Sequence, residues 1–103
     1  MALVSSRARR LRDAKLEALC RLPFDQLVRT YSAENEREVI DVDGRAFEVY
    51  ATGSFDTDQT SDFFVWVYVR PAWIAGIPFL RWLFSARGHH LAANPAARSG
   101  DSP

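Results

Sequence analysis

The stretch EVIDVDGRAFEVY, residues 38–50, decides the fold of this chain. Asp43-Gly44 at its centre is a strong signal for a two-residue hairpin turn, because a type I′ turn needs a positive φ at both central positions. The flanking residues alternate between apolar and polar, as in a half-buried strand. The turn sets a register in which these residues face each other: Val42 and Arg45, Ile40 and Phe47, and Glu38 and Val49.

The same alternation divides the predicted hairpin into two faces. The apolar face should join the core and carries Ile40, Val42, Phe47 and Val49. The wetter face carries Arg37, Val39, Asp41, Ala46, Glu48 and Tyr50.

A third strand is predicted over Asp62–Arg70, after the polar loop Thr52–Ser61. Its residues are β-branched or aromatic and follow a period of two, which favours a strand. The face that should continue the core carries Phe63, Val65, Val67 and Val69. The opposite, aromatic face carries Phe64, Trp66, Tyr68 and Arg70.

Two helical segments are predicted before the hairpin. In the first, an apolar stripe with helical spacing is formed by Leu11, Ala14, Ala18 and Leu22, widened by Leu16 and Leu19. Pro23 would kink a continuing helix but suits the first turn of a new one. The sequence therefore predicts helices over about 7–22 and 23–31, bent at Pro23 and packed on one face of the sheet.

The segment after Pro71 leaves alternatives open. Residues 73–77 could form a short fourth strand beside the third, and Pro78 suits the start of a helix to about Arg87 with Gly88 following it. The sequence of residues 89–103 is typical of a disordered tail. The expected fold class is α+β in one domain over residues 1–88, with bent N-terminal helices, a three- or four-stranded antiparallel sheet and a short C-terminal helix.

The order of these motifs resembles small uncharacterised bacterial domains that combine helices with an antiparallel sheet. The likeness rests on LPFDQLV (22–28), the hairpin EVIDVDGRAFEVY, and the strand VWVYV (65–69) with a following Trp73. It covers residues 16–78. These motifs are structural, so the resemblance implies a fold and adds no functional residue.

Length and charge narrow the possible classes of protein. A chain of 103 residues suits a single domain, and its one cysteine, Cys20, excludes an internal disulfide framework and a multi-cysteine zinc site. The net charge of zero hides a split: residues 1–30 carry four excess positive charges, residues 31–62 seven excess negative charges, and residues 63–103 three excess positive charges. The acidic middle of the chain argues against a nucleic-acid partner.

Oxygen-bearing side chains alternate in the polar loop, as ligands do in a calcium loop: Asp56, Asp58, Thr60 and Asp62. Ser61 and Val67 stand where a calcium loop needs Gly and Glu, so a solvated loop is the favoured interpretation.

Catalytic groups are equally sparse in the sequence. His89 and His90 are adjacent in the sequence, and the side chains of adjacent residues rarely bind the same metal ion. Cys20 is expected to be a small buried side chain. A small enzyme or ligand binder that uses Asp41, Asp56, Asp58 or the histidines has little support. We therefore expect no catalytic, cofactor-binding or metal residue, no cofactor, and no enzymatic activity.

Residues 63–84 form an apolar run of 22 residues, which is long enough to span a bilayer. Arg70 and Pro71 near its middle and the strand-like first half argue against a span, so a cytoplasmic location is expected. A cluster of arginines begins the first helix: Arg7, Arg9, Arg10 and Arg12. A solvated helix start is favoured over an anchor for an anionic surface.

Aromatic residues are concentrated late in the chain, since eight of the 13 lie in residues 63–84. One helical layer cannot cover both faces of a sheet, so part of this surface should be free for a partner. We expect a non-enzymatic protein-interaction module that self-associates or docks a larger protein. The predicted partner-binding residues are Phe64, Trp66, Tyr68, Arg70, Trp73, Phe79, Arg81 and Trp82. The alternative is a peripheral protein at the inner membrane face, held by the apolar C-terminal helix and the arginine cluster.

Overall fold

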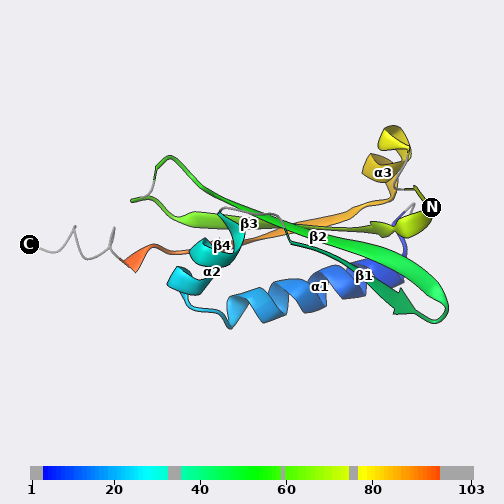
Figure 1. Ribbon diagram of the computed structural model, residues 1–103, viewed down its shortest axis with the longest axis horizontal. Helices are drawn as coiled ribbons and strands as arrows, with labels where there is room; N and C mark the ends of the chain where they lie inside the picture. Colours follow the sequence, from blue (N-terminus) through cyan, green and yellow to red (C-terminus); the bar gives the residue numbers. More distant parts are fainter. Residues whose placement is uncertain (1–3, 33–35, 59, 75–76, 96–103) are drawn as a thin grey trace, which may run out of the picture.

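The computed structural model describes residues 4–32, 36–58, 60–74 and 77–95. Two N-terminal helices lie on one face of a four-stranded antiparallel sheet, so the chain is α+β as predicted (Figure 1). The elements in chain order are α1 (Ser6–Cys20), α2 (Phe24–Tyr31), β1 (Glu36–Val42), β2 (Arg45–Phe55), β3 (Phe63–Pro71), the 3-10 turn η1 (Ala72–Ile74), α3 (Pro78–Phe84) and β4 (Ala86–Ala92).

The sheet is a simple meander with the strand order β1-β2-β3-β4. The predicted hairpin is confirmed, because Val42 lies opposite Arg45 and Ile40 opposite Phe47. Asp43 and Gly44 both have positive φ, 54° and 78°. The type I′ turn requires these values, so two residues set the register of the first strand pair.

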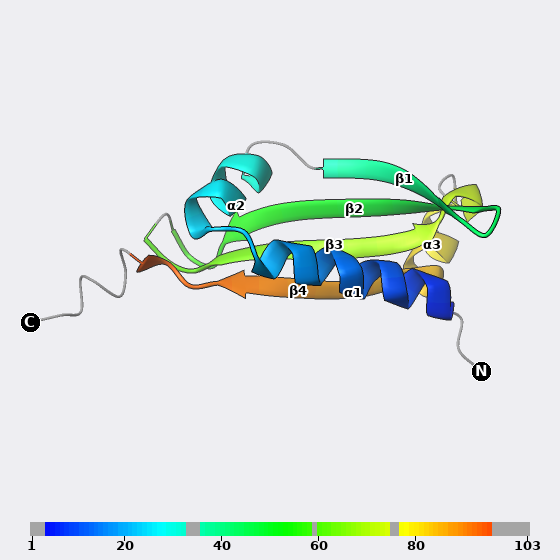
Figure 2. The ribbon, with the colours of Figure 1, turned by 90° about the horizontal axis from the view of Figure 1, so that it is seen from below.

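The helices form a second layer over part of this sheet (Figure 2). Ser5 caps α1, because its hydroxyl accepts a hydrogen bond from the backbone N–H of Ala8 at 3.1 Å. The chain turns at Pro23, which directly precedes α2. α1 packs on β3 and β4, whereas α2 packs on β2 and β3.

The core lies between these helices and the inner face of the sheet. The predicted valine face of β3 is fully buried, together with Leu19 of α1 and Leu27 and Tyr31 of α2. The predicted stripe on α1 is partly wrong, because Ala14 and Ala18 are exposed and Ala8 is buried. A Cβ atom at Gly88 of β4 would lie 2.8 Å from a methyl group of Leu16, so α1 makes its close approach to β4 through this side of the helix.

The end of the fold differs from the prediction. A short helix, α3, begins at Pro78 as predicted but ends at Phe84 instead of near Arg87, because residues 86–92 form β4, which pairs antiparallel with β3. The predicted tail beginning at residue 89 is therefore wrong. The possible fourth strand over 73–77 is also wrong, because Ala72–Ile74 is a 3-10 turn. Pairing with β3 explains the difference. β4 contains a glycine and two histidines, which have weak strand propensity, so this segment becomes a strand only because it pairs with β3.

The chain after β4 is held by side-chain contacts. The backbone N–H of Asn94 donates to the carboxylate of Asp62 at 2.9 Å, and its side-chain amide donates to the carbonyl of Ser61 at 3.0 Å. The folded unit therefore extends to residues that were expected to be a tail. Residues 96–103 of the predicted tail lie outside the described residues.

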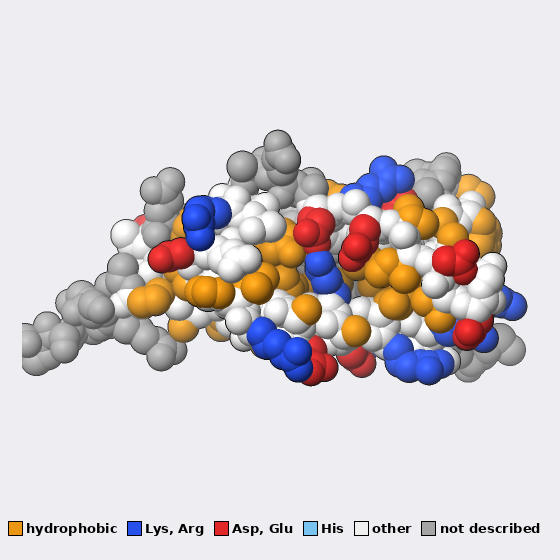
Figure 3. All heavy atoms as spheres, turned by 60° about the horizontal axis from the view of Figure 1, so that its bottom comes forward, with side chains coloured by type: hydrophobic (Ala, Val, Ile, Leu, Met, Phe, Trp, Pro, Cys, Tyr) orange, Lys and Arg blue, Asp and Glu red, His pale blue; other side chains and the backbone are white. Residues whose placement is uncertain are grey.

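Figure 3 looks onto the side of the molecule that comes forward from the bottom of Figure 1, where α1 lies, and hydrophobic side chains are visible between charged side chains of both signs. Ile40 and Val42 of β1 are only half-buried, because α1 packs over β3 and β4. The apolar run of residues 63–84 is divided among β3, η1 and α3. Among the residues that the structure describes, no helix is long and apolar enough to cross a membrane.

Candidate interaction surface

The sheet has one face turned away from α1 and α2, which we call the open face. In Figure 1, α1 lies below the sheet and α3 stands above it at one end only. Because strand side chains alternate between faces, the register places these residues of β2, β3 and β4 on the open face: Glu48, Tyr50, Thr52, Phe64, Trp66, Tyr68, Arg70, Arg87, His89 and Leu91. The predicted aromatic face of β3 is therefore part of the open face.

The end of the open face farthest from α3 is aromatic. The rings of Phe64 and Trp66 are stacked, with centroids 6.1 Å apart and an interplanar angle of 17°. The ring of His89 lies 4.8 Å from that of Trp66, and Leu91 faces Phe64 from β4. Trp66 is 39% exposed and Leu91 47% exposed. We call these four residues the aromatic end.

The middle of the open face carries two tyrosines from neighbouring strands. The rings of Tyr50 and Tyr68 lie 6.1 Å apart. Together with Thr52 and Arg70 they line a hollow of about 430 Å³. We call Tyr50 and Tyr68 the tyrosine row. A hollow lined by half-buried aromatic rings can receive a side chain from a partner surface.

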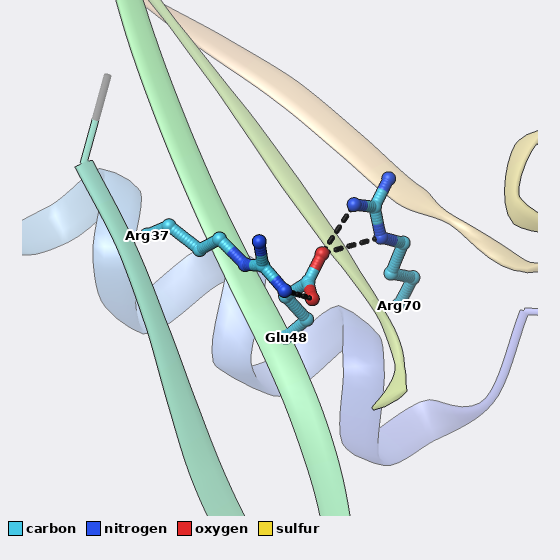
Figure 4. Close-up of polar contacts among 3 residues, drawn as sticks. All are labelled: Arg37, Glu48 and Arg70. Atoms are coloured by element: carbon cyan, nitrogen blue, oxygen red, sulfur yellow. Dashed lines mark hydrogen bonds and ion pairs between the residues drawn. The ribbon is translucent and has the colours of Figure 1, made fainter. Parts of the chain in front are cut away.

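Beyond the tyrosine row lies an ion-pair cluster (Figure 4). Glu48 is only 2% exposed and accepts hydrogen bonds from Arg37 at 2.7 Å and from Nε of Arg70 at 2.8 Å. A second nitrogen of Arg70 contacts the same carboxylate oxygen. Burial raises the pKa of Glu48, but the hydrogen bonds and charges of Arg70 and Arg37 outweigh it, so the pKa lies below its ordinary value.

The end of the open face next to this ion pair carries an apolar projection. Trp73 of η1 and Phe79 of α3 are 69% and 71% exposed, and Ile77 between them is also exposed. The rings of Trp73 and Phe84 meet edge to face at 6.1 Å. Ile74 is fully buried and anchors the segment to the body of the protein. We call Trp73, Ile77 and Phe79 the apolar cap.

The predicted arginine cluster lies next to the open face. Arg9 and Arg12 line a hollow of about 550 Å³ at the edge of β4, and Trp66 and Tyr68 line the same hollow. Arg12 also donates to the carboxylate of Asp13 at 2.9 Å. Arg7 pairs with Asp43 of the hairpin turn at 3.3 Å, and Arg10 is exposed.

The structure thus brings together groups that are far apart in the sequence. Of the predicted partner-binding residues, Phe64, Trp66, Tyr68 and Arg70 lie on the open face, and Trp73 and Phe79 lie in the apolar cap. The side chains of Arg81 and Trp82 lie outside the described residues. Tyr50, His89 and Leu91 were not predicted as site residues, although the alternation of Arg87, His89 and Leu91 is the signal of a strand face.

Cys20 is exposed, and the prediction of a buried side chain is wrong. It stands at the last residue of α1, where its Sγ lies 3.4 Å from Nδ1 of His90 in β4. The pairing could not be predicted, because residue 90 was expected in a tail.

The oxygen atoms of the polar loop after β2 accept hydrogen bonds from within the loop itself. The backbone N–H and hydroxyl of Thr60 donate to Oδ1 of Asp58 at 2.8 and 2.5 Å, and these bonds lower the pKa of Asp58. The hydroxyl of Ser61 accepts from the backbone N–H of Thr57 at 3.0 Å. These contacts are those of a turn built by short polar side chains.

Comparisons with protein-family models, with curated proteins and with solved structures found no match to this chain. The resemblance to small bacterial domains stays a prediction.

Proposed function

We propose that this protein is a non-enzymatic interaction module that associates with a protein partner, in the first instance a second copy of itself, through the open face. The observation that carries the proposal is the position of both N-terminal helices on the opposite face. They leave Trp66 and Leu91 exposed on the open face, and Trp73 and Phe79 of the apolar cap are exposed beyond the ion pair of Glu48 and Arg70. Exposed apolar side chains that gather on an uncovered sheet face mark a binding site.

The composition of the open face suits a protein interface. Aromatic residues and arginine are enriched at the centre of such interfaces, and Trp, Tyr and Arg supply most of their binding energy. Trp66 and Tyr68 would form the desolvated centre, and Arg70 is already oriented by its bonds to Glu48. A charge that is pre-ordered within the protein loses less entropy when it meets a partner.

The experiment is a measurement of molar mass in solution as a function of protein concentration. We expect the wild-type chain to form a dimer, and Trp66→Glu to weaken it by about tenfold or more because it places a charge in the apolar contact. Ala18→Glu is the matched control, because Ala18 is exposed on α1, away from the open face. Circular dichroism checks that both variants are folded. A wild-type chain that is monomeric at every concentration would overturn the proposal.

A second candidate is peripheral membrane association from the cytoplasm, at the inner membrane face. It is favoured by one observation: the apolar cap and the beginning of α1, which carries the exposed Arg9 and Arg10, lie at the same end of the molecule (Figures 1 and 2). Apolar side chains beside arginines suit the interface of an anionic bilayer. Co-sedimentation with anionic vesicles at low and high salt tests it, and no binding at low salt would exclude it.

A further inference from the structure

The open face carries two apolar patches at opposite ends. The aromatic end lies at the beginning of β3, and the apolar cap follows the end of β3, about 24 Å away for seven residues of strand. Trp66 and Leu91 belong to the first patch, and Trp73 and Phe79 to the second. α3, which carries Phe79, stands on the side of the sheet opposite α1 (Figure 1), and Trp73 lies at the same end of the sheet, where it lines a hollow with Ser5, Gly44 and Phe47.

Between the two patches, the open-face side chains of β3 are arranged about a midpoint. Along β3 the side chains on the open face follow the order Phe64, Trp66, Tyr68, Arg70, and the next position begins the segment of the apolar cap. Tyr68 of the tyrosine row is the centre of this series. Trp66, which belongs to the aromatic end, and Arg70 lie one row to either side, with Phe64 beyond Trp66 and the apolar cap beyond Arg70.

This order is self-complementary under a two-fold rotation. An axis parallel to the sheet and perpendicular to its strands, passing through the tyrosine row, would lay the open face of one copy on that of another with the strand ends exchanged. Each patch on one copy then meets the other patch on its partner, as an isologous interface requires. Trp66 meets Arg70 of the partner, a pair suited to a cation–π contact.

We propose that the protein forms a reciprocal dimer in which the apolar cap of each copy covers the aromatic end of the other. This rests on the proposed function, since it specifies how self-association through the open face would occur. α3 stands above the sheet, so it would collide with a flat partner surface. It could instead pass the end of an identical sheet, which favours a second copy as the partner.

The area of the face explains why the apolar cap is needed. Four strands about 4.8 Å apart and seven residues long offer roughly 450 Å² of sheet per copy. Two copies bury roughly 900 Å² through the sheets, slightly less than the minimum of roughly 1,000 Å² for a specific interface. The exposed side chains of the apolar cap, contributed twice, supply the remaining area.

Disulfide trapping between copies that carry a cysteine at different positions tests this arrangement of the dimer. In a Cys20→Ser background, Phe79→Cys and Leu91→Cys chains are prepared separately, mixed in equal amounts and mildly oxidised. Both positions are exposed, so the substitutions should leave the fold intact. We expect the mixed Phe79→Cys with Leu91→Cys disulfide to form several-fold more than either like-with-like disulfide. An Ala18→Cys chain, labelled on the exposed side of α1, gives the level of random collision.

The outcomes separate this inference from the proposed function. A solution dimer in which the mixed disulfide predominates supports both. A solution dimer whose like-with-like disulfides predominate, or whose mixed disulfide does not exceed the Ala18→Cys level, overturns the reciprocal arrangement and leaves self-association standing. A chain that is monomeric by molar mass overturns both.

Discussion

At Glu48 a carboxylate is buried on a face that is otherwise accessible to solvent. Arg70 and Arg37, from the strands on either side, cover it, donate hydrogen bonds to it and balance its charge. An isolated buried carboxylate would be strongly destabilising, whereas one with two charged donors is satisfied. Glu48 therefore ties β1, β2 and β3 together across the open face.

The pH dependence of stability should reveal this contact. The folded pKa of Glu48 lies below the unfolded value of about 4.3, so its contribution is fully present above that pH and is lost as pH falls through the folded pKa. We expect Glu48→Gln to lower the free energy of unfolding by about 1–2 kcal/mol at pH 7. This value is reduced for solvent screening, because Arg37 is largely exposed. Urea denaturation at pH 7 and pH 3 measures the difference, which should shrink at pH 3.

Glu38→Gln is the control, because Glu38 is an exposed glutamate in the adjacent strand β1. It should change the free energy of unfolding by less than about 0.5 kcal/mol. A Glu48→Gln effect that is equal at both pH values would contradict the ion-pair origin of the stabilisation.

The sequence predicts part of this residue-scale chemistry. Alternation placed Glu48 on the wetter face of the hairpin, which is correct. Its burial could not be predicted, because it depends on Arg70, whose position opposite Glu48 follows from the pairing of β2 with β3.

Among the elements, two strands carry a glycine on the face that packs against the helices. A Cβ atom at Gly53 of β2 would lie 2.5 Å from the ring of Phe63 and 2.8 Å from Cβ of Tyr31, both in the core. A Cβ atom at Gly88 of β4 would first meet a terminal methyl group of Leu16, at 2.8 Å. The first contact involves groups held by packing, whereas the second involves the flexible end of a side chain.

We therefore expect the two glycines to differ in their tolerance of alanine. Gly53→Ala should lower the free energy of unfolding by about 2–3 kcal/mol, because the ring of Phe63 and the backbone of α2 would have to move. Gly88→Ala should cost less than about half as much, since Leu16 can adopt another rotamer. The midpoints of urea unfolding compare them, and equal losses would show that α1 is held on β4 as rigidly as α2 is on β2.

The elements themselves differ in how well the sequence predicts them. The hairpin and β3 follow from local signals, Asp43-Gly44 and the alternation through Val65, Val67 and Val69. β4 does not, because His89, His90 and Gly88 have weak strand propensity and become a strand through pairing with β3. The exposed side chains of α1 were misassigned for a related reason, since β4 determines which side of the helix is covered.

The whole molecule is elongated, with extents of 54 × 26 × 24 Å and a radius of gyration of 15.5 Å. A compact chain of this length would have a radius of gyration of roughly 13 Å. One long sheet that is covered on one face by α1 and α2 produces this shape. The open face is thus a consequence of the two-layer architecture. Its aromatic half on β3 and the residues Trp73 and Phe79 of the apolar cap could be predicted, but the contribution of β4 could not.

Truncation tests whether β4 belongs to the folded unit. A chain that ends at Gly88 lacks the residues that pair with Phe63, Phe64, Val65 and Trp66, and it leaves part of α1 without a partner. We expect it to lose cooperative thermal unfolding. The full chain with Leu91→Ser is the control, since it keeps the backbone pairing of β4 and should retain a cooperative transition. Cooperative unfolding of the truncated chain at the wild-type midpoint would contradict this role.

The packing of α1 against β4 has a consequence for how the chain acquires its fold. Arg12 donates to the backbone carbonyl of Arg87, 75 positions later, and Cys20 meets His90, 70 positions later. Among the described elements, α1 is therefore completed by β4, the strand that is synthesised after all the others. The hairpin around Asp43-Gly44 can form during synthesis, whereas the apolar side of α1 must wait, so folding should be slow for a domain of this size and begin in the middle of the chain.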